Sequence, residues 1–564
     1  MDWKDQAKPM MHNKFSSCRG VSFELKPSPG SSFALQAHDG HGPPQQPPDA
    51  TSAGRWVWLP QTFSRASSRI FPAAFGRSPS LASSHFCDLD DEGADDDEEM
   101  AVAAAAAAVD DAPGKKASAP AASAKEAPSA RSRLGVILLD QGLFTVYKRL
   151  FVLCFALNAV GLALAATGHF PYARGHAAVF AMGNILALTL CRSEAVLRAV
   201  FWLAVALFGR PWVPVVVKTG VTAILQSLGG VHSGCGVSSL AWLAYALVRA
   251  QLQRRDGMTP REVVGVASAI LGLLALSCLA AFPLLRHLHH NVFERTHRFA
   301  GWTALALLWV FVVLSAGYDP TTASYVRLTG AALVKRQELW LATAITFFTV
   351  LPWLTVRRVP VTVTARSSHA SVITLQGGVK AGLLGRISRS PLSEWHAFGI
   401  ISDNGDTHAM LAGAVGDFTR GLISDPPTRL WVRGVHFAGL PYLLNMYRRA
   451  TMVATGSGIC VFMSFLMQPG PAELSLVWVA KGIEANYGEE MKAAACGSER
   501  LRGRVVVHDT AVMGRPDVAA LAVDAARRWG SEVVVVTSNP EGSRDVVTAC
   551  NKAGIPAFGP IWDS

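Results

Sequence analysis

The stretch PLSEWHAFGIISDNGD, residues 391–406, divides the sequence into two unlike parts. Trp395, His396 and Phe398 stand at the start of a short apolar run, which ends in the polar turn SDNGD. This pattern predicts a β-strand that carries flat ring side chains near its first residues. Long apolar segments precede the stretch, whereas short strands separated by polar turns follow it. It therefore lies shortly after the chain has left the long apolar segments, in a domain of another kind.

Upstream of this strand the chain is too apolar for an ordinary soluble protein. Hydrophobic residues make up 50% of the 564 residues although the N-terminal quarter is polar, and they concentrate between Thr145 and Val356. A helix needs about 20 residues to cross the core of a bilayer. We therefore expect a polytopic membrane domain over residues 141–358 with about six helices, at residues 146–167, 176–208, 228–248, 263–285, 299–317 and 338–356.

The distribution of Lys and Arg predicts how these helices are oriented. Basic clusters at residues 148–149, 286–298 and 355–360 would share one side, which the positive-inside rule makes cytosolic. A further cluster at residues 249–261 would then lie on the outer side, against the rule. The first fourteen residues lack an apolar core, so we expect the first membrane helix to act as the insertion signal.

The N-terminal tail, residues 1–140, has the composition of a disordered segment. It is rich in Ser, Pro, Gly and Ala, and it contains the acidic run DLDDEGADDDEE at residues 88–99. Such a segment cannot bury enough apolar surface to offset its ordering entropy. We expect a disordered cytosolic tail. The formal charge of +11 does not indicate nucleic-acid binding, because the basic residues gather at helix ends rather than in one stripe.

Downstream, the chain predicts two domains of soluble character. Alternating segments such as VPVTVTA and LWVRGV indicate a β-domain over residues 359–448. Near-continuous apolar strands such as LSLVWVA and EVVVVTS, with the helical stretch DVAALAVDAARRWG among them, indicate parallel strands in an α/β domain over residues 449–564.

About six helices, a β-domain that carries EWHAF, and a Gly-rich turn on an α/β unit resemble the NADPH oxidase and ferric reductase superfamily. Within it the chain is most similar to fungal TmpA-type integral membrane proteins and their plant counterparts. The resemblance implies a ferredoxin reductase-like pair of domains, in which a β-barrel binds FAD and a doubly wound α/β domain binds NAD(P)H.

The resemblance assigns the FAD site to two stretches. The family's His-Pro-Phe-Thr motif, which runs along the flavin, appears here with Gly in place of Thr, so a hydroxyl that could bond the flavin is absent. The family's Gly-Asp-Trp-Thr turn, where a helix N-terminus meets the FAD pyrophosphate, appears here as GDFT. The implied FAD contacts are His396, Ala397, Phe398 and Gly399, then Gly416, Asp417, Phe418 and Thr419.

The resemblance also implies a nicotinamide nucleotide site. Glycines in the turn TGSG would let the backbone approach a pyrophosphate, and Arg515 in GRPD would meet a ribose phosphate or belong to a turn that caps the next helix. Phe558 or Trp562 would stack on the flavin or pack the C-terminal segment. The implied turn residues are Thr455, Gly456, Ser457 and Gly458. Where the family has Cys-Gly-Pro, this chain has Ser538-Asn539-Pro540.

Two haems in this superfamily are held by His pairs thirteen or fourteen residues apart on the third and fifth helices. The third helix here offers His232 and the fifth His297, without a second His at that spacing on either helix. The pattern therefore excludes two haems. It leaves open a single haem between His232 and His297, or two structural imidazoles.

Two functions follow from these expectations. In the first, NAD(P)H reduces FAD and electrons pass to an unidentified acceptor. In the second, a catalytically degenerate relative acts as a redox or nucleotide sensor, or as a signalling scaffold. A transporter has little support, because the predicted spans hold few acidic residues. The superfamily implies the plasma membrane with the reductase module in the cytosol, whereas the choice of NADH or NADPH stays open.

Overall fold

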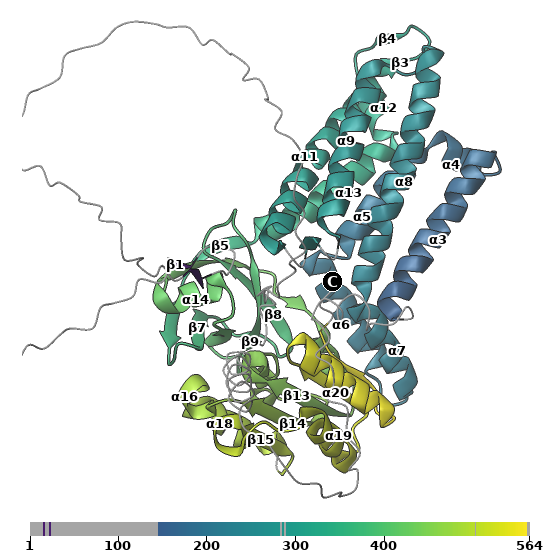
Figure 1. Ribbon diagram of the computed structural model, residues 1–564. Coiled ribbons are helices and arrows are strands. Elements are labelled where there is room, and N and C mark those ends of the chain that lie inside the picture. The colour runs from purple at the N-terminus through teal and green to yellow at the C-terminus, as the bar shows by residue number, and fades with distance from the viewer. Residues whose placement is uncertain are drawn as a thin grey trace, which may run out of the picture. The chain divides into compact units, whose positions relative to one another are not determined.

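The computed structural model describes residues 145–560 apart from 283–284, 287–288 and 502, together with two short antiparallel strands, β1 (Phe15–Ser16) and β2 (Ser22–Phe23). The prediction of a disordered tail therefore falls almost wholly outside the described residues, and Trp562 does so too. Figure 1 labels the elements that follow.

Helices occupy the first part of the described chain. Apolar runs form them, and polar or glycine residues end them: Thr145 caps the first helix, and Gly168 ends it in a left-handed conformation with φ of 87°. A hairpin of β3 (Tyr318–Asp319) and β4 (Ser324–Tyr325) follows the helix that ends at Gly317. The helices are α3 (Val146–Thr167), α4 (Pro171–Gly175), α5 (Ala177–Leu190), α6 (Glu194–Phe208), α7 (Val215–Gln226), α8 (Leu228–Arg255), α9 (Arg261–Ala280), α11 (His290–Gly317), α12 (Gly330–Val334) and α13 (Gln337–Leu354).

Four of these helices, rather than six, are long and apolar enough to cross a membrane: α3, α8, α9 and α11 from Val292. The predicted helix over 176–208 is broken at residues 191–193 into α5 and α6. The polar run Arg192-Ser193-Glu194 interrupts the apolar pattern at this point, and Glu194, the first residue of α6, pairs with Arg386 and Arg433 of a sheet far along the chain. The predicted helix at 338–356 forms α13, which does not reach the same length and hydropathy.

An antiparallel sheet follows the helices. Its strands pair in the order β5-β11-β8-β9-β10-β7-β6, with β12 beside β8. No pairing joins β5 to β6 among the described residues, so the predicted barrel is an open sheet. The strands are β5 (Val356–Pro360), β6 (Thr362–Ala365), β7 (Ala370–Gln376), β8 (Leu383–Ser388), β9 (His396–Ile401), β10 (Thr407–Gly413), β11 (Arg429–Arg433) and β12 (Phe437–Ala438), and α14 (Asp417–Ser424) lies between β10 and β11.

A parallel five-stranded sheet forms the last part, in the order β15-β14-β13-β16-β17. Its strands are buried valine-rich runs, as expected of a sheet covered on both faces. They are β13 (Arg449–Thr455), β14 (Glu473–Ala480), β15 (Val505–Asp509), β16 (Val533–Thr537) and β17 (Ala557–Phe558); the helices are α15 (Cys460–Met467), α16 (Ile483–Tyr487), α17 (Glu489–Cys496), α18 (Thr510–Met513), α19 (Val518–Trp529) and α20 (Pro540–Lys552). The predicted order of a β-domain and then an α/β domain is confirmed.

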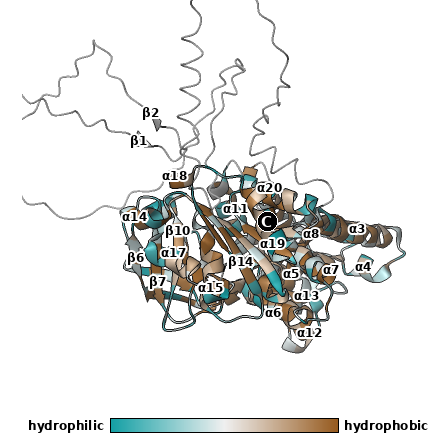
Figure 2. Cartoon of the chain, turned by 90° about the horizontal axis from the view of Figure 1, so that it is seen from below, coloured by the Kyte–Doolittle hydropathy of each residue, from teal (hydrophilic) through white to brown (hydrophobic). Residues whose placement is uncertain are grey.

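Helices cover both faces of this sheet. Buried residues of α19 and α20 form a core with one face, whereas α15 belongs to a second core that also includes the antiparallel sheet and Phe201 of α6. All residues of α15 except its last are buried. In contrast, α3 exposes large apolar side chains along its length, such as Val152, Leu157 and Val160, and appears strongly hydrophobic in Figure 2. The molecule thus holds a buried apolar helix between two sheets and an uncovered one at its edge.

Candidate functional site

The parallel sheet has a topological switch point between β13 and β16. From β13 the chain proceeds outward through β14 and β15, and it then returns to build β16 and β17 on the other side. Ligands of open α/β sheets bind beyond the carboxyl ends of the strands at such a point. Thr455 ends β13 and Ser538 follows β16, and their hydroxyl oxygens lie 2.8 Å apart in a buried hydrogen bond. This bond ties the two strand ends together where the sequence predicts the nucleotide.

Of the predicted TGSG residues, Thr455 ends β13, and the other three lie in a buried 3₁₀ turn over Gly456–Ile459, which leads directly into α15. Gly456 has φ of 52°, a conformation that favours glycine. The indole N–H of Trp478, on β14, donates to the Gly456 carbonyl oxygen at 3.1 Å. Trp478 was not among the predicted site residues, because a tryptophan inside an apolar strand signals only a core position. Its hydrogen bond links β14 to the glycine-rich turn and so helps to fix the position of Gly456.

The predicted flavin residues of EWHAF lie on β9 and pack inward. The imidazole ring of His396 stacks on the ring of Phe418 with centroids 3.9 Å apart, and the ring of Phe398 lies 6.4 Å from Phe418. The structure thus brings together members of the two predicted FAD stretches. Because the His396 and Phe418 rings are in stacking contact, a flavin ring has no room between them.

Close packing explains why position 399 on β9 is occupied by glycine. A Cβ atom at this position would lie 2.7 Å from Cγ1 and 2.8 Å from the backbone nitrogen of Val461 on α15. The threonine of the family motif therefore has no space here. Ser464 of α15 accepts from the Ser402 N–H at 2.9 Å and donates to the Ile400 carbonyl oxygen at 2.5 Å. Helix α15 is thus bonded directly to the strand β9 region.

The predicted GDFT turn forms the N-terminus of α14. The Thr419 hydroxyl accepts from the backbone N–H groups of Val415 and Gly416 at 3.1 and 3.0 Å. Among the described residues, no acceptor meets the N–H groups of Asp417 and Phe418 at the first two helical positions. Free N–H groups at a helix start are suited to a phosphate.

The glycine-rich turn after β13 and the N-terminus of α14, the two phosphate-type elements suited to bind a phosphate, are neighbours. Gly413 ends β10 three residues before Gly416, and a Cβ atom on Gly413 would lie 2.9 Å from the hydroxyl oxygen of Ser457. The glycine-rich turn and the strand that leads into α14 therefore meet at the same place. These residues fit the phosphates of a dinucleotide, whereas the surface at Gly399 departs from the family's flavin contact.

The chemistry of this region is polar rather than nucleophilic. Burial raises the pKa of the Cys460 thiol, at the start of α15, to about 12, so the thiol stays protonated and inert at neutral pH. At the edge of β15, burial raises the pKa of Asp509, but backbone N–H groups of Ile483, Ala511 and Gly482 outweigh it and hold the pKa below its usual value. A charged carboxylate thus stands at the carboxyl end of the sheet.

The remaining predicted contacts are dispersed. Arg515 is exposed in the turn before α19, and Asp517 in the same turn caps that helix by accepting from the Ala520 N–H at 2.9 Å. The capping alternative for this turn is therefore observed. Phe558 lies on β17, packed against the core that contains α15.

His232 of α8 and His297 of α11 lie close to one another. Their ring centroids are 6.5 Å apart. Nδ1 of His232 lies 3.0 Å from the Leu188 carbonyl oxygen, and Nδ1 of His297 lies 3.3 Å from that of Ser277. Backbone bonds at Nδ1 orient an imidazole and leave Nε2 for a metal. The pair fits the donor set of one bis-imidazole haem. The described residues contain no group of three or more His, Cys, Asp or Glu arranged to hold a metal ion.

A polar network inside the helices was not predicted from sequence. Asn158 of α3 accepts from the Trp242 indole N–H at 2.9 Å and from the Asn184 amide at 2.8 Å. The signal that could have identified it is the presence of Asn158 and Asn184 within otherwise apolar segments, since amides in such helices usually face a partner or a site.

Comparison with known proteins places the chain beside fungal reductases. The family described as "Adenylate-forming reductase 03009, C-terminal domain" matches residues 440–564. Adenylate-forming reductase 06235 of Coprinopsis cinerea is 34% identical over 435 residues, and adenylate-forming reductase 03009 of the same fungus is 33% identical over 430 residues. Each match covers 76% of this chain.

Among solved structures, phthalate dioxygenase reductase is similar with 12% identity and a TM-score of 0.28, over 36% of this chain and 68% of that one. A ferredoxin-NADP+ reductase of Plasmodium falciparum, solved with 2′P-AMP, is similar with 11% identity and a TM-score of 0.28, over 36% of this chain and 94% of that one. The chain spans 41% of the length of the two fungal relatives that it matches, both of which are named adenylate-forming reductases.

Proposed function

We propose that this chain is a membrane-anchored oxidoreductase that passes electrons from NAD(P)H through FAD to an acceptor, related to the NADPH oxidase and ferric reductase superfamily and to TmpA-type proteins. The observation that carries the proposal is the meeting of two phosphate-type elements: the glycine-rich turn at the switch point, and the N-terminus of α14 beside it.

The chain's own residues have defined roles in this proposal. The free N–H groups of Asp417 and Phe418 would bind the FAD phosphates, and the turn over residues 455–458 would bind the nicotinamide nucleotide. When bound, the two groups would supply hydride and electron transfer. The Thr455–Ser538 bond would hold the two strand ends at a fixed spacing around the nucleotide. Ser538 and the crowding at Gly399 are the features that favour the alternative, a sensor without turnover.

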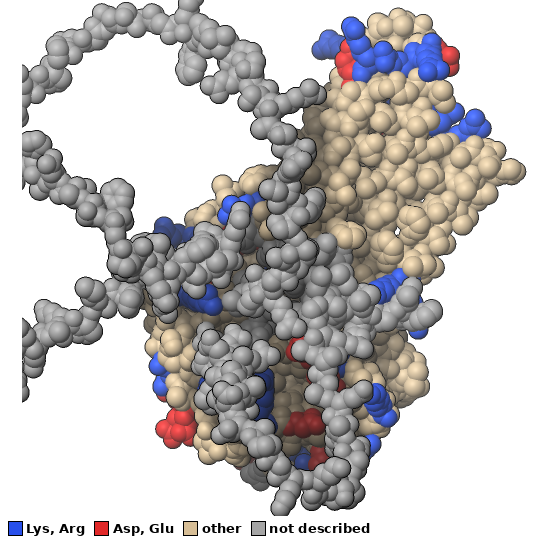
Figure 3. Space-filling model, in the orientation of Figure 1, with Lys and Arg blue, Asp and Glu red and all other residues tan. Residues whose placement is uncertain are grey.

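Membrane anchoring is supported by surface chemistry. Figure 3 shows a broad face of the helices with almost no charged side chain, bounded by charges at the far end and at the sheets. Val152, Leu157 and Val160 of α3 are 59%, 65% and 60% exposed, and lipid would cover them. The superfamily favours the plasma membrane, with the two sheet domains in the cytosol.

The first test is an absorption spectrum of the full chain in lipid nanodiscs, before and after NADPH under anaerobic conditions. We expect a flavin band that bleaches on addition. Asp417→Pro removes one phosphate-binding N–H at a helix position that accepts proline, and Gly416 before it is already extended. The loss of one charge-assisted hydrogen bond should weaken FAD about tenfold or more.

Asp417→Ala is the matched control, because it removes the same carboxylate but keeps the N–H. It should bind FAD at least as tightly as the wild-type chain. A folded wild-type chain that neither contains nor takes up FAD would overturn the oxidoreductase proposal and leave the sensor or scaffold.

A second proposal concerns one haem between His232 and His297, favoured by the 6.5 Å separation of their rings and the backbone contacts of both Nδ1 atoms. His232→Ala should abolish a Soret band in the purified chain, while His176→Ala, at an exposed position before α5, should keep it. The absence of a Soret band from haem-supplemented wild-type protein would identify the two imidazoles as structural.

A further inference from the structure

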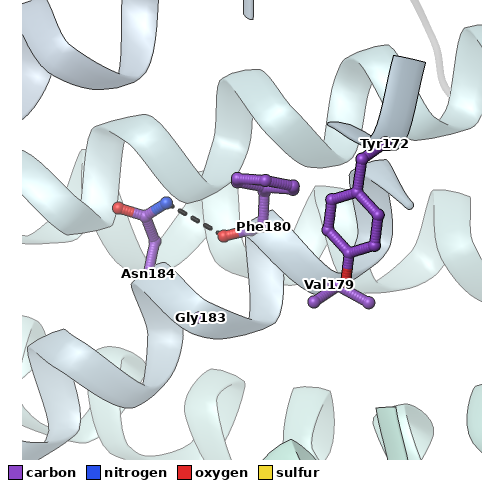
Figure 4. A pocket seen from close by; sticks show the side chains of 5 residues that line it. All are labelled: Tyr172, Val179, Phe180, Gly183 and Asn184. Atoms are coloured by element: carbon purple, nitrogen blue, oxygen red, sulfur yellow. Dashed lines mark hydrogen bonds between the residues drawn. The ribbon is translucent and has the colours of Figure 1, made fainter. Parts of the chain in front are cut away.

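A largely open pocket of about 220 Å³, called the cavity below, is lined by residues of α4 and α5, outside the nucleotide and histidine sites. Its lining consists of Tyr172, Val179, Phe180, Gly183 and Asn184 (Figure 4). At about 30 Å³ for each water, the space equals roughly seven waters, which is enough for a molecule of one or two rings. The lining carries no formal charge, so the fitting occupant is uncharged.

Hydrogen bonding fixes the orientation of the one amide in this wall. The indole N–H of Trp242 can only donate, so Asn158 must present its oxygen to it. That same oxygen then requires a donor from Asn184, whose amide nitrogen supplies it at 2.8 Å. The second N–H of this nitrogen reaches the Phe180 carbonyl oxygen at 2.9 Å, as the dashed line in Figure 4 shows.

The amide oxygen of Asn184 is consequently a free acceptor. Both of its N–H groups are used, and no donor among the described residues reaches its Oδ1. Asn184 is only 9% exposed, and the residue lines the pocket. A polar group held among apolar helices without its full set of partners is costly unless something else supplies them. The missing partner must be a hydrogen-bond donor.

Aromatic rings shape the rest of the site. The ring of Phe180 stacks on that of Trp242 at 4.7 Å, and the ring of Tyr172 stacks on that of His176 at 4.4 Å, so both walls are held in place. Gly183, within helix α5, has nothing within 4 Å of where a Cβ would stand. Packing against the described residues therefore does not require a glycine, which destabilises a helix by about 1 kcal/mol relative to alanine. The glycine keeps the cavity open.

We infer that this cavity binds a small, uncharged, lipid-soluble ring compound that carries a hydroxyl group, with the hydroxyl donating to Oδ1 of Asn184 and the ring lying against Phe180 and Tyr172. The inference is independent of FAD, NAD(P)H and haem, because none of the residues involved belongs to those sites.

The test uses 2-naphthol as the probe and the full chain in nanodiscs, with binding to empty nanodiscs subtracted. We expect saturable binding to the wild-type chain and about tenfold weaker binding of 2-methoxynaphthalene, which has the same rings but no donor. Gly183→Leu should abolish saturable binding by filling the cavity, without disturbing the amide network.

Gly272→Leu is the matched control, since this exposed glycine of α9 also has open space at its Cβ position and lies outside the cavity. It should bind 2-naphthol like the wild-type chain. Three results would each overturn the inference. The first is equal binding of the two probes, and the second is binding by Gly183→Leu that equals that of the wild-type chain. The third is uptake of 2-naphthol by empty nanodiscs with no additional binding to the chain.

Discussion

At the scale of single residues, Glu194 joins the helices to the antiparallel sheet by ion pairs. Its carboxylate lies 2.7 Å from both Arg386 and Arg433, and its side chain is 5% exposed. Removing one partner from a buried ionic group leaves the others uncompensated, at a cost of about 3–5 kcal/mol. Glu194→Gln should therefore lower the unfolding temperature of the chain in nanodiscs markedly, measured by tryptophan fluorescence.

The control for this prediction is Glu490→Gln. Glu490 pairs with Arg366 at 2.5 Å, but the two side chains are 79% and 44% exposed, so the pair is screened by solvent. Its loss should change the free energy of unfolding by no more than about 1 kcal/mol. Equal shifts for the two variants would contradict the structural role of Glu194.

At the scale of elements, strand β10 and the loop residue before β12 bring His408 close to His436, with ring centroids 5.8 Å apart. Burial lowers the pKa of His436 to about 4, and His408, Arg198 and Arg357 add to the effect. Since an unfolded histidine has a pKa near 6.5, the unfolded chain binds the proton first as the pH falls. The free energy of unfolding should decrease by about 2 kcal/mol between pH 7 and pH 5 on this account.

Denaturant unfolding at the two pH values measures this effect. His436→Gln should reduce the pH dependence, because the depressed group is gone, whereas His369→Gln, at an exposed position, should leave it unchanged. A His436→Gln variant with the full wild-type pH dependence would show that other groups cause it.

At the scale of the whole described unit, α8 extends from the core that contains the sheets to the far end of the helices. Its first residue, Leu228, packs against the core that contains the sheets, and its 28 residues extend about 42 Å at 1.5 Å per residue. That exceeds the roughly 30 Å of a bilayer core. In sealed vesicles, Asp256→Cys beyond the end of α8 should react with an impermeant maleimide on the face opposite to Cys496 of α17.

Peptide mass spectrometry would identify each labelled cysteine. Cys496 is exposed, so it needs no engineering and serves as the internal control. Labelling of both positions from the same face would contradict a membrane-spanning α8. The result would also decide the side of the basic cluster 249–261, whose predicted position departs from the positive-inside rule.

Local patterns in the sequence by themselves determined the type and position of those helices, strands and turns that depend only on residues near one another in the chain. The first apolar run predicted α3 at its observed bounds, because a polar cap and a glycine stop flank it. The alternating and then continuous apolar strands predicted a β-domain followed by an α/β domain with parallel strands, since side-chain periodicity reports how many faces are buried. The turn TGSG was found for the same local reason, as glycines after an apolar strand.

Only the tertiary structure decided the features that join residues far apart in the chain. Glu194 at the start of α6 meets two arginines about two hundred residues away, a pairing that no window of sequence contains. The Thr455–Ser538 bond and the 6.5 Å approach of His232 and His297 are likewise set by sheet order and helix packing. The periodicity of apolar residues specifies which face of a helix or strand is buried. Which other element packs against that face depends on the arrangement of the whole fold.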